Sequence, residues 1–232
     1  TADAADEAVA ETTGGETSSE PDEPPCRPTG QAGALQQRNV DAGGTPRWYL
    51  LSAPEEETGP LPLVIDFHGL AEGAETHARM TGYGELAMTE GILVALPHGT
   101  GQPVSWNVGP GIAGANVQAD LDFITALIDD VAADHCVDRS RVYATGLSNG
   151  AMISSYAACA LDGVFAAVAP VAGASVVDDC VPDRPVPFLT IHGTADPILR
   201  FNGGVGDIGA VLDGGSSEAV AAPADLDGPG YP

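Results

Sequence analysis

The residues best suited to chemistry lie in one short stretch, in which Ser148 is flanked by glycines. Gly146-Leu147-Ser148-Asn149-Gly150 fits G-x-S-x-G, the pattern of a nucleophile elbow, where a sharp turn from a strand into a helix exposes a serine. The short run 141–145 precedes the motif and a helix-like segment follows it, so the strand–turn–helix context is present. We therefore predict that Ser148 is a catalytic nucleophile rather than part of an ordinary glycine-rich turn.

A serine nucleophile also needs hydrogen-bond donors for the negative charge that develops on the substrate oxygen. The residue after the nucleophile supplies one backbone N–H, here that of Asn149. His68-Gly69-Leu70 directly follows a buried-strand pattern, and we predict the N–H of Leu70, or of a close neighbour, as the second donor. We expect His68 itself to hold this loop, and a role as the catalytic base is the less favoured alternative.

The acid that orients a catalytic base is expected to follow a later strand, in the chain order serine, acid, histidine. Asp196 meets this condition after the strand-like run 186–192, although an Asp-Pro turn is the alternative interpretation. Asp178 and Asp179 are fallback candidates that precede this run. No histidine follows Asp196, and His192 ends the strand that bears the acid, so no base is evident. We therefore expect the chain as given to be inactive and truncated at its C-terminal end.

A loop rich in glycine and proline contains Trp106 and Asn107, which are candidates for lining a substrate pocket. Packing of Trp106 under the loop for purely structural reasons is an equal alternative. The run 204–209 matches G-x-G-x-x-G, but neither a strand nor an amphipathic helix adjoins it, so we assign it no function. No His/Cys cluster has the spacing of zinc ligands, and we predict neither a metal nor a cofactor.

Alternating strands and helices must position these residues. Strand patterns cover 47–53, 61–67, 92–96, 141–145, 165–171 and 186–192, and helix patterns cover 75–89, 117–133 and 149–161. This alternation predicts an α/β fold with a mainly parallel central sheet and helices on both faces. In the helix 117–133, Asp120 and three further aspartates are expected mostly to face water. Residues 1–25 are expected to be a disordered acidic tail, and 26–232 one domain whose last part, 203–232, is irregular.

The charge balance and the cysteines limit the possible partners and compartments. The chain has 33 acidic and 8 basic residues and a formal net charge of −25, which excludes nucleic acid and anionic membranes as partners. No apolar run is long enough to span a membrane, although the acidic tail is typical of a tether to a lipid anchor upstream. The four cysteines, Cys26, Cys136, Cys159 and Cys180, predict an exported protein with two disulfides, with buried thiols as the alternative.

Five linked motifs resemble the secreted polyhydroxybutyrate depolymerase/feruloyl esterase family of the α/β-hydrolase superfamily. They are H-G-x-x-E-G, P-H-G-T-x…S-W-N, D-R-S-R-V-Y-A-T-G-L-S-N-G-A-M, A-A-V-A-P-V-A-G and V-P-F-L-T-I-H-G-T-A-D-P, and they extend over about 47–204. The resemblance implies a serine esterase with Ser148 as nucleophile and Asp196 as acid. Family members carry their histidine in a Gly-His-Trp-like segment beyond the last strand, which this sequence lacks. The family's cysteine positions suggest the pairs Cys136–Cys159 and Cys26–Cys180.

These observations together predict a secreted serine esterase with an α/β-hydrolase fold whose last strand and helix are missing. The expected substrates are feruloyl or acetyl esters of plant polysaccharide, or a hydroxyalkanoate polyester, hydrolysed through an acyl-enzyme. Two alternatives stay open. One is a hydrolase-fold binding protein that has lost its base, and the other is a serine peptidase of the same fold.

Overall fold

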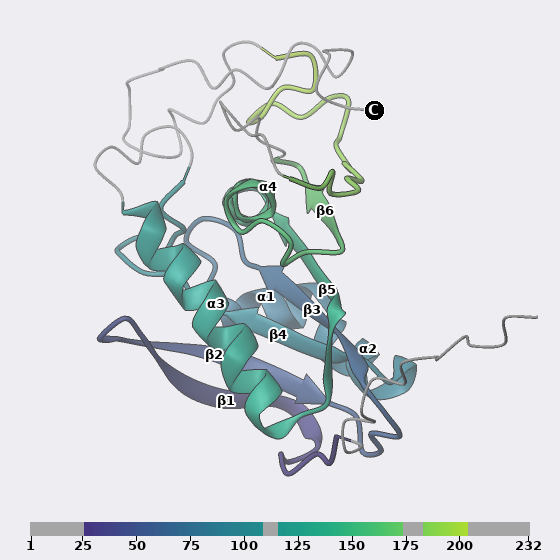
Figure 1. Cartoon of the computed structure of the whole chain (residues 1–232). Helices are drawn as coiled ribbons and strands as arrows, with labels where there is room; N and C mark the ends of the chain where they lie inside the picture. The colour runs from purple at the N-terminus through teal and green to yellow at the C-terminus, as the bar shows by residue number, and fades with distance from the viewer. Residues whose placement is uncertain (1–25, 109–115, 174–182, 204–232) are drawn as a thin grey trace, which may run out of the picture.

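The computed structural model describes residues 26–108, 116–173 and 183–203. In this part of the chain, six strands form one sheet in the order β1-β2-β4-β3-β5-β6 (Figure 1). The strands are β1 Gly33–Ala42, β2 Thr45–Ala53, β3 Leu61–Phe67, β4 Leu93–Pro97, β5 Val137–Leu147 and β6 Ala167–Val171. The helices are α1 Ala74–Thr81, α2 Tyr83–Glu90, α3 Val117–Asp134 and α4 Asn149–Ala160.

The sheet is parallel where the candidate site residues lie. β4, β3, β5 and β6 run in the same direction, whereas β1 pairs antiparallel with β2, and β2 antiparallel with β4. This arrangement confirms the expected mainly parallel sheet. The carboxyl ends of parallel strands meet at one edge of a sheet, so the loops that follow β3, β4 and β5 emerge side by side.

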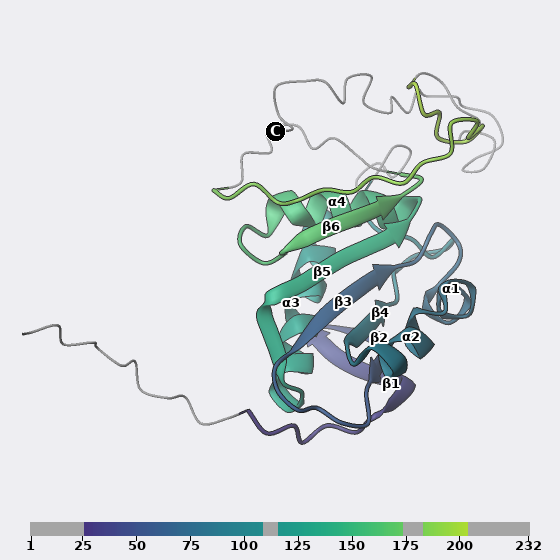
Figure 2. The same cartoon turned by 90° about the vertical axis from the view of Figure 1, so that its right-hand side faces the viewer.

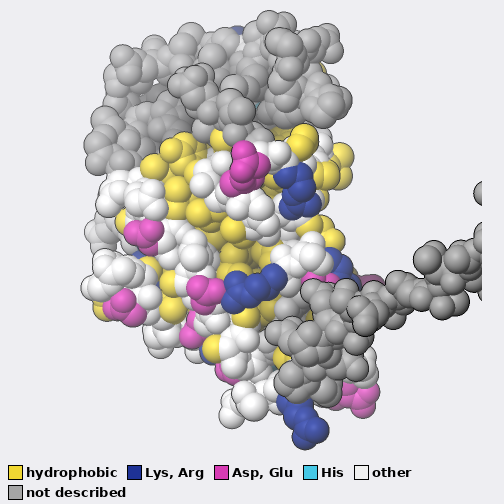
Figure 3. All heavy atoms as spheres, in the orientation of Figure 1, with side chains coloured by type: hydrophobic (Ala, Val, Ile, Leu, Met, Phe, Trp, Pro, Cys, Tyr) yellow, Lys and Arg dark blue, Asp and Glu magenta, His cyan; other side chains and the backbone are white. Residues whose placement is uncertain are grey.

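Helices cover both faces of the sheet. Figure 2 shows α3 and α4 on one side and α1 and α2 on the other, with the main core between the sheet and the first pair. The apolar stripe of α3 is buried as expected, but Asp120 is fully buried too, which corrects the expectation that it faces water. Its position explains this, because Asp120 lies one turn from Val117 and one turn from Ile124, on the stripe itself. On the face seen in Figure 3, charged side chains are scattered among hydrophobic ones.

Three elements differ from the sequence pattern, and one of them, the strand β1, has no predicted counterpart. The single helix expected over 75–89 is split into α1 and α2, because Gly82 adopts a left-handed conformation with φ 68° and its N–H bonds to the Ala78 carbonyl. The segment 186–192 runs parallel to β6 but makes only two isolated bridges, Val168 to Phe188 and Val171 to Ile191. Pro170 of β6 has no N–H to donate to the Leu189 carbonyl, which interrupts the ladder, although four backbone hydrogen bonds still join the segment to β6 and to Ala172 beyond it.

The disulfide pairing suggested by the family resemblance is wrong. Cys26 is bonded to Cys136, with the two Cα atoms 5.7 Å apart. The pairing depends on the N-terminal segment, whose residues Thr29 and Gly30 donate backbone hydrogen bonds to the Asp134 carbonyl at the end of α3. This contact places Cys26 beside Cys136, which sequence spacing cannot show. Cys159 is disulfide-bonded as well, and Cys180 lies outside the described residues.

Several expectations concern residues outside the described part of the chain. They are the tail 1–25, the fallback acids Asp178 and Asp179, and the residues beyond 203, which include the G-x-G-x-x-G match. None of the helices in the described ranges is both long enough and apolar enough to cross a membrane.

Candidate active site

Ser148 occupies a strained turn between β5 and α4. Its backbone has φ 55° and ψ −115°, a conformation that residues other than glycine rarely adopt. The Ser148 N–H donates to the Val171 carbonyl at the end of β6, at 2.9 Å. The turn is therefore held to the neighbouring strand while the serine side chain remains half-buried.

Close packing explains the glycines around Ser148. A Cβ atom at Gly150 would lie 2.1 Å from the Phe67 carbonyl oxygen, and one at Gly146 would lie 2.7 Å from the same atom. A Cβ atom at Gly173 would lie 2.3 Å from the Ser148 carbonyl oxygen. The end of β3 and the loop after β6 thus press against the elbow, and only glycine fits at these three positions.

The two predicted donor groups belong to segments next to the serine. Asn149 is the first residue of α4, where backbone N–H groups have no partner within the helix. In the loop after β3, Gly69 N–H donates to Glu72 Oε2 at 2.8 Å and Ala71 N–H donates to the Val104 carbonyl at 2.7 Å. Leu70 N–H, in contrast, has no acceptor among the described residues. A Cβ atom at Gly69 would lie 3.9 Å from Ser148 Cβ, so this loop adjoins the nucleophile.

The His68 ring lies inside the structure, where it holds two loops together. Its Nδ1 lies 2.7 Å from the Gly69 carbonyl oxygen, and its Nε2 accepts a hydrogen bond from Gly99 N–H at 2.9 Å. These partners require a neutral ring with the proton on Nδ1. Burial lowers the pKa of His68 to about 4, which also favours the neutral form.

The Asn149 side chain fixes the loop that follows β4. Its Oδ1 accepts a hydrogen bond from Trp106 N–H at 2.7 Å, and its Nδ2 donates to the Val108 carbonyl at 2.9 Å. The Trp106 indole is fully buried and donates through Nε1 to the His68 carbonyl at 2.9 Å. These contacts favour the packing alternative for Trp106, since a fully buried indole offers no surface to a substrate.

Asn107 is held by a buried ion pair that sequence reasoning missed. Asp120 Oδ2 accepts hydrogen bonds from Asn107 N–H and Nδ2, at 2.7 and 2.9 Å. Asp120 Oδ1 lies 3.1 Å from an Arg47 nitrogen, and Arg47 also donates to the His98 carbonyl at 3.2 Å. The position of Asp120 on the apolar stripe of α3 was the available sequence signal, because a buried carboxylate needs a cationic partner.

A second buried cluster supports the loop that carries Leu70. His77 Nε2 lies 2.9 Å from Asp66 Oδ1, and His77 Nδ1 lies 3.1 Å from Glu72 Oε2. Burial lowers the pKa of His77, but the hydrogen bonds and charges of Asp66 and Glu72 outweigh this effect, so the net shift is upward. Two carboxylate partners fit an imidazolium that donates from both nitrogens.

Asp196 lies in the turn after the edge segment 186–192. Its Oδ1 accepts hydrogen bonds from the N–H groups of Ile198 and Leu199, at 2.8 and 3.0 Å. Its Oδ2 lies 3.3 Å from His192 Nε2, which in turn lies 2.6 Å from the Leu199 carbonyl oxygen. In the described ranges no histidine is hydrogen-bonded to Ser148, so the geometry provides a fixed carboxylate but no base in contact with the serine.

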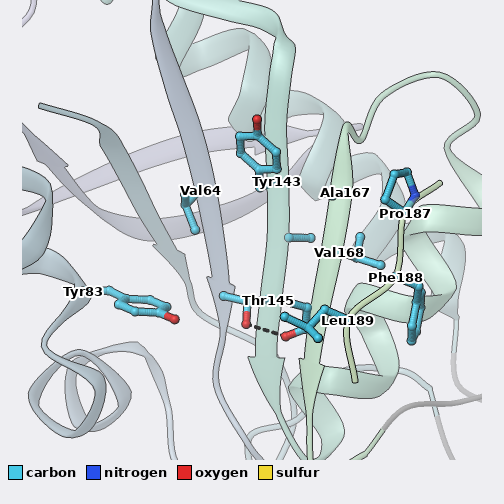
Figure 4. A pocket seen from close by; sticks show the side chains of 11 residues that line it. Val64, Tyr83, Tyr143, Thr145, Ala167, Val168, Pro187, Phe188 and Leu189 are labelled. Carbon is cyan, nitrogen blue, oxygen red and sulfur yellow. Dashed lines mark hydrogen bonds between the residues drawn. The ribbon is translucent and has the colours of Figure 1, made fainter. Parts of the chain in front are cut away.

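A pocket of about 400 Å³ lies apart from these residues, on the α1–α2 side of the sheet (Figure 4). Its walls are mainly apolar, with Val64, Tyr83, Tyr143 and Leu189 among the lining residues. The Thr145 hydroxyl at one wall donates to the Ala169 carbonyl at 2.7 Å. None of the predicted site residues lines this pocket, so we do not assign it to the candidate active site.

Comparison with known proteins identifies the family. Residues 48–182 match the family described as esterase PHB depolymerase. The chain belongs to this family. The matched region contains Ser148, the loop 68–72 and the Trp106 loop, whereas Asp196 lies beyond it.

Two relatives show how much of a family member the chain represents. It is 34% identical over 171 residues to feruloyl esterase B of Piromyces equi, which covers 70% of the chain and 31% of that protein. It is 29% identical over 151 residues to a bifunctional acetylxylan esterase/xylanase of Neocallimastix patriciarum, which covers 64% of the chain and 21% of that protein. The chain therefore spans less than a third of either relative.

Solved structures show the α/β-hydrolase fold. A thermostable esterase superposes with a TM-score of 0.59 at 22% identity, over 72% of this chain and 48% of that one. The protein sOPH superposes with a TM-score of 0.57 at 16% identity, over 75% of this chain and 71% of that one. At sequence identities of this size, structural similarity establishes the fold but not the reaction that the protein catalyses.

Proposed function

We propose that the protein is a serine carboxylic-ester hydrolase in which Ser148 attacks the ester carbonyl. The observation that carries this proposal is the strained turn that holds Ser148, directly before Asn149 at the start of α4 and beside the loop of Leu70, whose N–H has no acceptor among the described residues. A carbonyl carbon attacked by Ser148 Oγ places its oxygen where two such donors can stabilise the developing charge. Membership in an esterase family supports the same reaction class.

The proposed reaction proceeds in two steps. Ser148 Oγ bonds to the carbonyl carbon and loses its proton to a base, the alcohol leaves with a proton, and water then hydrolyses the acyl-enzyme. We assign Asp196 as the acid that orients this base. The sequence has no histidine after His192, so we propose that residues 1–232 alone acylate slowly. Added imidazole, a small general base, should therefore accelerate the reaction.

The substrate class follows from the relatives. Feruloyl and acetyl esters of plant polysaccharide are the first candidates, because the two relatives are a feruloyl esterase and an acetylxylan esterase. The family description adds hydroxyalkanoate polyesters. Methyl ferulate, acetylated xylan and a polyhydroxybutyrate suspension, tested with imidazole present, would rank these classes. Activity on anilides but not on esters would favour the peptidase alternative.

The direct experiment is covalent labelling of the serine. Residues 1–232 are incubated with a fluorophosphonate probe, with and without imidazole, and the adduct is located by peptide mass spectrometry. We expect a single adduct on Ser148, formed faster with imidazole and absent in Ser148→Ala. A folded protein whose Ser148 does not react under either condition would sink the proposal and favour a non-catalytic binding protein.

The disulfides support a proposed extracellular location. Cys26–Cys136 and the disulfide of Cys159 are expected to persist only in an oxidising compartment. Alkylation of the protein recovered from its native host should find these cysteines protected from iodoacetamide before reduction. Free thiols in a folded native protein would contradict export.

A further inference from the structure

A series of buried side chains connects the sheet to the loop that carries Leu70. Asp66 is on β3, His77 is on α1 and Glu72 is in the loop between them, with side-chain exposures of 2%, 1% and 13%. Asp66 Oδ1 bonds to one ring nitrogen of His77, and Glu72 Oε2 bonds to the other. Glu72 Oε2 also accepts the Gly69 N–H, so the series ends on the peptide group next to Leu70.

The direction of the Leu70 N–H follows from the partners of Gly69. In a trans peptide the N–H of one residue points opposite to the C=O of the residue before it. The Gly69 carbonyl lies 2.7 Å from His68 Nδ1 and accepts the Glu72 N–H at 3.3 Å. These two contacts hold the carbonyl on one side, so the Leu70 N–H must point to the other. Glu72 thus contacts both ends of the Gly69 residue, through its side chain and its own N–H.

We propose that Glu72, held by His77 and Asp66, is a positioning residue that directs the Leu70 N–H toward the substrate oxygen. The inference rests on the proposed function, because it assigns Glu72 a purpose only if attack by Ser148 creates an oxyanion on the substrate. Loss of one oxyanion donor typically lowers the rate by about 10²–10³-fold. A donor that is misdirected rather than removed should lower it less, by roughly tenfold.

The charges around the cluster predict how this role depends on pH. His77 faces Asp66 on β3 and Glu72 in the loop, with His68 nearby and Tyr83 of α2 beside Asp66. While His77 is protonated, it neutralises one of the two carboxylates. As the pH rises through the raised pKa of His77, the Glu72 side chain loses its charged partner, and the loop is expected to loosen.

The experiment measures the rate constant of Ser148 labelling by a fluorophosphonate at a fixed imidazole concentration. We expect Glu72→Ala to lower it about tenfold. Glu72→Gln should restore most of the rate, because the amide oxygen can still accept the Gly69 N–H. Glu75→Gln, an exposed carboxylate one turn away on α1, is the matched control and should label like the wild type. In a pH series, the alkaline fall of the wild-type rate should be absent in Glu72→Ala.

The outcomes separate this inference from the proposed function. If Glu72→Ala is folded and labels as fast as the wild type, Glu72 has no positioning role and the inference is overturned. If the wild type itself does not label, the proposed function fails and this inference fails with it. Should Glu72→Ala not fold, Glu72→Asp replaces it, because a shorter carboxylate cannot reach both Gly69 N–H and His77. A wild-type rate and pH profile in Glu72→Asp would then overturn the inference.

Discussion

The two halves of the candidate site differ in how firmly the fold holds them. The nucleophile half, formed by the ends of β3 and β5 and the start of α4, is buried and connected by hydrogen bonds through His68, Glu72 and Asn149. The acid half lies on the edge segment 186–192 and the turn after it. Four backbone hydrogen bonds, interrupted at Pro170, join this segment to β6 and Ala172. Leu189 and Ile191 on this edge are 62% and 54% exposed. The proposed nucleophile and donors are thus held by buried contacts, whereas the proposed acid follows an exposed edge segment with an interrupted ladder.

The largest expected effect tests this difference at the chemical step. Ser148→Ala should abolish imidazole-assisted labelling, because it removes the attacking oxygen. Asp196→Asn should change the labelling rate of residues 1–232 by less than about threefold, because among the described residues the carboxylate contacts no base that reaches the serine. The same probe assay, followed by mass spectrometry, measures both variants. A loss of more than tenfold in Asp196→Asn would show that the two halves already work as one unit.

Steric tolerance is the second way to compare the halves. Gly150→Ala should lower the free energy of unfolding by roughly 3 kcal/mol, because the new Cβ would clash with the Phe67 carbonyl. Gly193→Ala should change it by less than about 1 kcal/mol, because a Cβ atom there has no described neighbour within 4 Å. Urea unfolding followed by fluorescence measures both. Equal losses at the two positions would contradict the difference in packing.

The disulfide should add to the stability on the well-packed side. Cys26→Ser leaves Cys136 unpaired and removes a cross-link between residues 110 positions apart. By loop entropy this is expected to cost about 5 kcal/mol. Urea unfolding of the variant, with the wild type under reducing conditions as a second reference, measures the loss. An unchanged unfolding midpoint would show that the N-terminal segment is already held by its backbone contacts.

A smaller effect on stability, which depends on pH, should come from the buried side chain of His68. The pKa of His68 is lowered to about 4, so the folded state resists its protonation, whereas the unfolded chain takes up the proton near pH 6.5. The contribution of His68 to the free energy of unfolding is therefore complete above about pH 6.5. It falls by about 3 kcal/mol as the pH drops to 4. Unfolding free energies of the wild type and His68→Asn across this range provide the test. If the two curves run parallel, His68 does not titrate as described.

Features that depend on local chemistry could be predicted from the sequence. The strand 61–67 has the predicted bounds, and the helix over 117–133 differs by one residue at its end, because apolar periodicity and runs report directly on burial. The elbow at Ser148 could be recognised because it requires glycines, which avoid steric clashes, at fixed positions within a few residues of the serine. The split at Gly82 was one exception, since a glycine inside a helical pattern does not reveal its backbone conformation. The strand β1 and the interrupted edge segment 186–192 were others.

The tertiary structure decided whatever depends on contacts between distant segments. Cys26 pairs with Cys136 because residues 29–30 lie against the end of α3, and cysteine spacing contains no information about that contact. The burial of Asp120 against Arg47 likewise joins α3 to β2. The link from Asp66 through His77 to Glu72 joins three elements around Leu70. The sequence by itself determined the G-x-S-x-G motif, most of the elements and the family resemblance, since these are short-range properties. Only the folded chain determined which side chains hold the loop 68–72, because their partners come from strands and helices that meet on folding.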